Sequence, residues 1–168
     1  MIKEINSTIE LPYKLIDIST GDERFVFSFK RFNEGQNEYS IKNYGITGDF
    51  EVAYKCSGIE SKFECDITIG NLYAFYIGLD NAYDCLGKEP IAILKNYGET
   101  LNRTKLIFRF NKCGHCFVSG CFKNKSNRYK SGIIFDDIEI DNAIFISEIL
   151  ISLEKFFNEL KRIQGHSN

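Results

Sequence analysis

Apolar and polar residues alternate along much of the first half of the chain. Over residues 24–32, Phe25, Phe27 and Phe29 share one side, while Ser28 and Lys30 take the other. This two-residue period is typical of a half-buried strand. Similar alternation over residues 46–55 and 62–69, on either side of a short turn, predicts a hairpin with one solvated face.

The period becomes helical after Gly70. Apolar residues recur at three- and four-residue intervals from Leu72 to Leu86, which predicts a helix with Asn71 as N-cap and Gly87 just beyond its C-terminus. A broad apolar stripe over residues 146–163 predicts a second helix, which Asp141-Asn142 can cap.

Strand signals also occur outside these segments, over residues 13–19, 91–97, 104–110, 115–122 and 133–140. Runs of strands without regular alternation with helices favour an α+β class. We therefore expect an antiparallel sheet of about seven to eight strands with two amphipathic helices packed on one face. A length of 168 residues fits a single domain over 1–168. Within it, the polar, mixed stretch 1–12 predicts weak order.

Composition and charge exclude several classes of protein. The chain is 43% hydrophobic, which excludes intrinsic disorder, and its net charge of −2 does not favour a nucleic-acid or membrane-surface binder. No apolar run approaches the roughly 18 residues of a membrane span, and the first residues lack a signal-peptide core. We expect a cytoplasmic protein with neither nucleic acid nor membrane as partner.

Among the six cysteines, Cys113-Gly114-His115-Cys116 matches the active-site tetrapeptide of protein disulfide isomerases. That chemistry needs the first thiol at a helix N-terminus, whereas the residues that follow predict a strand. The chain also has no Trp, and its two prolines, Pro12 and Pro90, both precede the motif. We therefore interpret the cysteines as mostly reduced and buried.

Zinc binding is a second possibility for the same segment. Cys113, His115, Cys116 and Cys121 are candidate ligands within nine residues. Structural zinc sites usually combine two separated ligand pairs, and no second pair is present. We expect no metal, and a thiol or zinc protein remains a less favoured alternative. The sequence also lacks nucleophile-elbow, P-loop and dinucleotide-binding motifs, so we expect neither an enzyme nor a cofactor.

Two charged clusters follow these cysteines. The acidic one comprises Asp136, Asp137, Glu139 and Asp141, and the basic one comprises Lys123, Lys125, Arg128 and Lys130. Such clusters usually form a solvated loop and a protected strand edge. The acidic cluster is also the candidate surface for a basic protein partner, whose approach it would steer.

Several stretches resemble the WapI-type bacterial immunity proteins. They are residues 44–52, 66–76, 106–110, 114–120, with the pattern G-H-x-x-V-x-G, and 133–160. The resemblance, mainly over 44–160, implies a cytoplasmic antidote that binds a cognate secreted toxin and neutralises it by occlusion. It implies no catalytic residues and no cofactor. A small-ligand-binding or regulatory α+β domain, with an enclosed aromatic pocket, is the alternative function.

Overall fold

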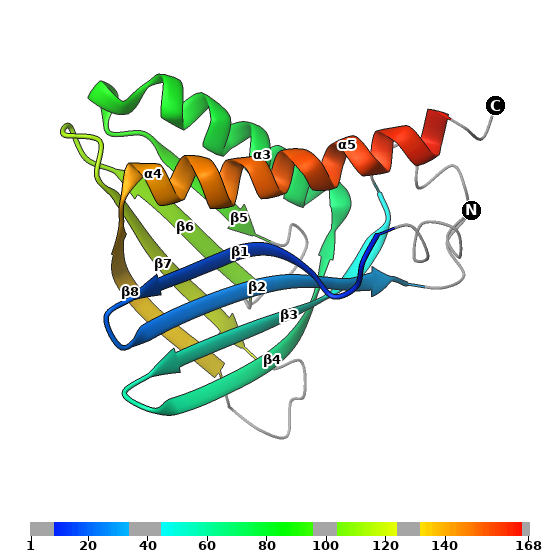
Figure 1. Ribbon diagram of the computed structural model, residues 1–168, viewed down its shortest axis with the longest axis horizontal. Helices are drawn as coiled ribbons and strands as arrows, with labels where there is room; N and C mark the ends of the chain where they lie inside the picture. The colour runs from blue at the N-terminus through cyan, green and yellow to red at the C-terminus, as the bar shows by residue number, and fades with distance from the viewer. Residues whose placement is uncertain (1–8, 34–44, 96–103, 124–131, 166–168) are drawn as a thin grey trace.

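Two four-stranded antiparallel sheets and two longer helices are seen in the computed structural model, which describes residues 9–33, 45–95, 104–123 and 132–165 (Figure 1). The N-terminal sheet contains β1 (Tyr13–Thr20), β2 (Glu23–Phe32), β3 (Thr47–Cys56) and β4 (Ile59–Thr68), in that order. The C-terminal sheet contains β5 (Ile91–Lys95), β6 (Thr104–Phe110), β7 (Cys116–Lys123) and β8 (Gly132–Ile140), again in chain order.

The helices follow the sheets along the chain. After β4 come α3 (Ile69–Asp84) and a short 3₁₀ turn, η1 (Leu86–Lys88). After β8, one continuous helix is built from α4 (Asn142–Ile144), a π-helical stretch η2 (Phe145–Leu150) and α5 (Ile151–Gly165). Both helices lie on the same side of the molecule (Figure 1). The predicted α+β class is thus confirmed, with the strands divided between two sheets.

Aromatic side chains join the two sheets directly. The ring of Phe25 in β2 lies 5.9 Å from that of Phe122 in β7 and 4.7 Å from that of Phe135 in β8, centroid to centroid. Tyr54 in β3 stacks on Phe135 at 5.0 Å, and its hydroxyl donates a hydrogen bond to Glu23. All three Phe side chains are buried. The contact between the sheets therefore depends on a small aromatic cluster.

The helices pack on the inner faces of both sheets. Phe156 of α5 meets Phe29 of β2 at 5.1 Å, and Phe145 of η2 meets Phe110 of β6 at 5.0 Å. A hydrogen bond also links α5 to the N-terminal sheet, because the Tyr13 hydroxyl of β1 donates to the carbonyl oxygen of Ser152. The helices thereby close the core on the side that Figure 1 shows uppermost.

Two predicted helix caps are wrong and one is confirmed. The N-cap of α3 is Thr68, whose hydroxyl accepts a hydrogen bond from the Asn71 N–H, because β4 runs directly into the helix. Gly87 lies within η1, and the left-handed residue that ends this turn is Glu89. Asp141 does cap the second helix, since its carboxylate accepts from the Ala143 N–H at 2.6 Å.

Gly120 in β7 sits beneath the ring of Phe135. A Cβ at this position would lie 2.4 Å from that ring, so Gly120→Ala should destabilise the fold by about 1–3 kcal/mol through overpacking. The matched control is Gly78→Ala in α3, where a Cβ would meet only Ala92 at 3.7 Å. This control should be neutral or stabilise by up to about 1 kcal/mol. Thermal unfolding measures both, and equal melting temperatures would contradict the proposed close packing.

Candidate binding surface

The outer faces of the two sheets differ in chemistry. Charged pairs cover the outer face of the N-terminal sheet, namely Lys14–Asp17, Arg24–Asp17, Lys30–Glu64, Arg31–Asp49 and Lys62–Glu60. The Arg24 guanidinium, which donates to Asp17, lowers the pKa of that carboxyl. Such a face is stable in water and offers little apolar surface to a partner.

The outer face of the C-terminal sheet carries exposed isoleucines. Ile91 and Ile93 of β5 are 56% and 44% exposed, and Ile134 of β8 is 72% exposed. Phe117 of β7 lies between them, half-buried, on the same face. Helix α3 packs on the opposite face, where Phe75 contacts the buried Phe108. We call this uncovered surface the β5–β8 face.

The strand register arranges this face in three rows across the sheet. The first row is Ile91, Arg109, Phe117 and Glu139; the second is Ile93, Ile107 and Ser119; the third is Lys95, Lys105, Cys121 and Ile134. The apolar residues therefore run through all three rows. Isolated exposed isoleucines are ordinary, but several on one sheet face make that face a candidate interaction surface.

Charged side chains bracket the aromatic ring in the first row. The guanidinium of Arg109 lies 5.5 Å from the centre of the Phe117 ring and donates to Asp137 at 2.7 Å. On the other side, the Nδ1 atom of His115 lies 2.5 Å from a Glu139 carboxylate oxygen. These pairs hold the charged groups in place without removing them from solvent, since their side chains are about half exposed.

The predicted acidic cluster divides between two roles. Asp136 and Asp137 occupy a bulge in β8, where Asp137 has a φ of +52° and its N–H donates to the Ser119 hydroxyl. The bulge exposes both carboxylates along the edge strand, next to Glu139. Asp141 instead caps the second helix. A bulge can direct side chains in this way because the extra residue breaks the alternation of the strand.

A shallow groove crosses one end of the β5–β8 face. It encloses about 430 Å³ and is lined by Glu89, Ile91, Arg109, Phe110, Asn111 and Phe117. Its walls combine apolar rings and side chains with a guanidinium and a carboxylate. It offers a partner an insertion point for one anchoring side chain.

The exposed isoleucines were not predicted as site residues, although the sequence contains a signal for them. The runs Ile91-Ala92-Ile93-Leu94 and Ile133-Ile134-Phe135 are apolar without alternation. Continuous apolar runs are typical of strands with both faces covered. Because the helices cover only one face, the second set of side chains is left exposed.

The first three residues of the Cys-Gly-His-Cys segment lie in the hairpin turn between β6 and β7, and Cys116 begins β7. The side-chain oxygen of Asn111 accepts hydrogen bonds from the N–H groups of Cys113 and His115, and Gly114 supplies a φ of +85°. No helix begins at Cys113. The segment therefore lacks the helix dipole that would activate a thiolate.

The candidate zinc ligands do not converge. Cys116 is buried on the inner face of β7, Cys121 is half-buried on the outer face, and Cys113 is exposed in the turn. His115 is directed to Glu139. Within the described ranges, no three His, Cys, Asp or Glu side chains come together as a metal site.

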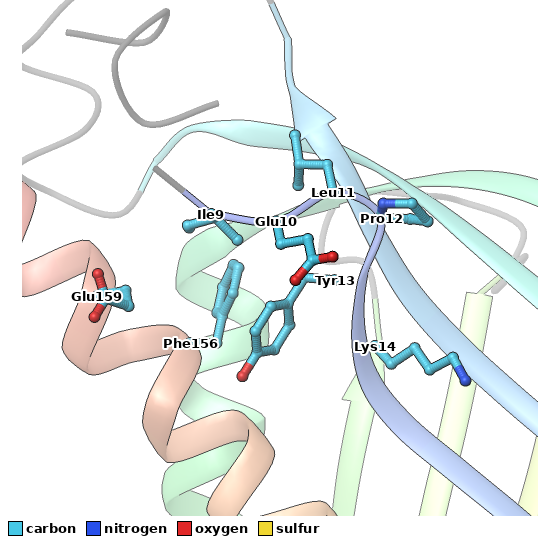
Figure 2. A pocket seen from close by; sticks show the side chains of 8 residues that line it. All are labelled: Ile9, Glu10, Leu11, Pro12, Tyr13, Lys14, Phe156 and Glu159. Atoms are coloured by element: carbon cyan, nitrogen blue, oxygen red, sulfur yellow. The ribbon is translucent and has the colours of Figure 1, made fainter. Parts of the chain in front are cut away.

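A second hollow lies where the N-terminal segment meets α5 (Figure 2). It encloses about 480 Å³ and is lined by residues 9–14 together with Phe156 and Glu159. Figure 2 shows Glu10, Tyr13 and Phe156 gathered around it, with Glu159 on the helix beyond. Among the residues that the structure describes, the hollow is open to the surface, unlike the enclosed aromatic pocket that a small-ligand-binding domain would need.

Several predicted features fall on residues outside the described ranges. They are most of the basic cluster, namely Lys125, Arg128 and Lys130, together with residues 1–8 of the stretch expected to be weakly ordered. Of the basic cluster, Lys123 is described and lies exposed at the end of β7. Comparison of the chain with protein families, curated proteins and solved structures found no match. No helix in the described part of the chain is long and apolar enough to cross a membrane.

The cysteines should differ sharply in reactivity toward an aromatic disulfide reagent. Cys113 and Cys85 are exposed and should react in the folded protein. Cys116 should react only after unfolding, because burial raises the pKa of its thiol. Cys113→Ser should remove part of the fast phase, whereas Cys116→Ala should leave it unchanged. A fast phase that decreases in the Cys116 variant would contradict this assignment.

Proposed function

We propose that this chain is an immunity protein that binds a cognate secreted toxin through the β5–β8 face and neutralises it by occlusion. One observation carries the proposal: Ile91, Ile93 and Ile134 are exposed together on a sheet face that no described helix covers. The resemblance of the sequence to WapI-type immunity proteins supplies the class of partner.

The layout of the face suits recognition of a protein. Apolar and charged side chains alternate across it: Ile91, Ile93 and Ile134 lie on its two edge strands, and the inner strands carry Ile107 and Phe117 beside Lys105 and Arg109. Protein interfaces typically combine apolar and polar side chains in this way, with aromatic residues and arginine enriched. A rigid sheet also presents these side chains with little loss of conformational entropy on binding. Occlusion needs no reacting group on this chain, only coverage of the toxin's active site or substrate surface.

The acidic edge, formed by Asp136, Asp137 and Glu139, would orient the toxin electrostatically as it approaches. These carboxylates project from β8, at one margin of the face. Basic groups on a toxin would be attracted to this edge before the apolar surfaces meet. The edge therefore acts on the rate of association more than on the lifetime of the complex.

The first test replaces one exposed isoleucine. The binding partner to test is the C-terminal domain of the protein encoded immediately upstream, as the expected toxin. Ile134→Asp should weaken its binding by about tenfold or more, because the substitution buries a charge in the apolar interface. Ile59→Asp is the matched control, since Ile59 is 74% exposed on the β3–β4 hairpin, away from this face. Titration calorimetry with the purified toxin domain measures both variants.

Growth rescue on co-expression supplies the functional readout. The wild-type chain and the Ile59 variant should protect cells, and the Ile134 variant should protect them less. Unfolding curves for each variant exclude loss of folded protein as the cause. No complex between the wild-type chain and the toxin domain, with no rescue, would reject the proposed function. Equal effects of the two substitutions would reject the proposed surface.

The acidic edge is tested by its effect on kinetics. The double variant Asp136→Asn with Glu139→Gln should slow toxin association about three- to tenfold at low salt and have little effect at high salt. Glu60→Gln with Glu64→Gln removes the same charge from the N-terminal sheet and is the control. Stopped-flow association rates at two ionic strengths measure the effect. A decrease independent of salt would contradict a steering role.

A further inference from the structure

We infer that, without toxin, the β5–β8 face is covered by the same face of a second copy of this chain. The inference uses the surface assigned above but not the toxin. One feature supports it: the arrangement of the charges on this face is complementary to itself.

Cationic and acidic side chains stand on different parts of the face. The cations are Lys95, Lys105, Arg109 and, just beyond the third row, Lys123, and the carboxylates are Asp136, Asp137 and Glu139. They are segregated, because Lys95 and Lys105 lie side by side at the β5–β6 end of the third row. Glu139 lies at the diagonally opposite corner, in the first row of β8. The two remaining corners are apolar, Ile91 and Ile134.

The proportions of the face make this pattern self-complementary. Four strands about 4.8 Å apart span roughly 14 Å, and three rows of alternate residues along a strand also span roughly 14 Å. The grid is therefore nearly square. A two-fold axis along the diagonal from Ile91 to Ile134 exchanges the basic and acidic corners. The strands of the two copies then cross at about 90°, which is an established mode of sheet packing.

This arrangement pairs the charged corners and buries the apolar side chains at the same time. Lys105 of each copy lies over Glu139 and the β8 bulge of the other. The isoleucines and Phe117 of the two copies contact one another between the charged corners and are buried from water. Because the contact is isologous, every favourable charge contact occurs twice, and a single substitution acts twice.

The decisive experiment uses a charge swap without toxin. Light scattering after size exclusion should give twice the mass of one chain at high micromolar concentration. Lys105→Glu places a carboxylate opposite Glu139 in both contacts and should raise the dimer dissociation constant at least tenfold. Glu139→Lys should do the same with two cations. Mixed in equal amounts, the two variants should form a heterodimer as tight as the wild-type dimer, because both contacts are restored.

Control variants exclude indirect effects. Lys62→Glu and Ile59→Asp alter exposed residues of the N-terminal sheet and should leave the dimer unchanged. Melting temperatures establish that the Lys105 and Glu139 variants remain folded. A wild-type chain that stays monomeric overturns the inference, as do variants that dimerise normally or fail to recover on mixing. Toxin binding by a strictly monomeric chain overturns this inference alone, and dimerisation without toxin binding overturns only the proposed function.

Discussion

The packing of Phe25 against Phe122 and Phe135 is the contact on which the rest of the fold depends. It joins strands from the two sheets, at ring distances of 5.9 and 4.7 Å. The contact needs Gly120, since any side chain there would occupy the space of the Phe135 ring. The sheets meet at this cluster, while the helices pack against the other inward-facing rings, including Phe29 and Phe110. Removing the cluster would separate two sheets that are each too small to bury their own apolar faces.

The same packing determines which surface is left for binding. Both helices lie on the inner faces, so each outer face depends on its own side chains for its behaviour in water. The N-terminal sheet carries charged pairs there, such as Arg24 with Asp17. The C-terminal sheet carries Ile91, Ile93 and Ile134. Charged pairs thus cover the first outer face, whereas the second outer face leaves apolar side chains in contact with water.

Local pattern predicted the elements well and their assembly poorly. The alternation of Phe25, Phe27 and Phe29 predicts a strand with one buried face, and that face is buried. The alternation does not predict that Phe25 contacts a second sheet, because that contact joins residues about a hundred positions apart. The acidic residues were predicted as a candidate surface from charge alone. Their place beside exposed isoleucines depends on a bulge at Asp136-Asp137 and on strand pairing, which sequence spacing does not encode.

If the chain is the antidote proposed above, its exposed apolar sheet face must be protected from non-specific contacts until the toxin binds. Self-association through that face would provide this protection, because the apolar side chains of each copy would be withdrawn from water. It also imposes a condition on affinity. In the proposed scheme the toxin would bind only the monomer, so its apparent affinity would fall by the fraction of chain that is dimeric. A dimer of micromolar affinity hides the face when the antidote is abundant, yet it costs a nanomolar toxin complex little. Complementary charges at opposite corners suit such a weak, reversible contact better than an extended apolar interface would, because screened ion pairs at the margin fix the register of the two sheets while adding little to their affinity.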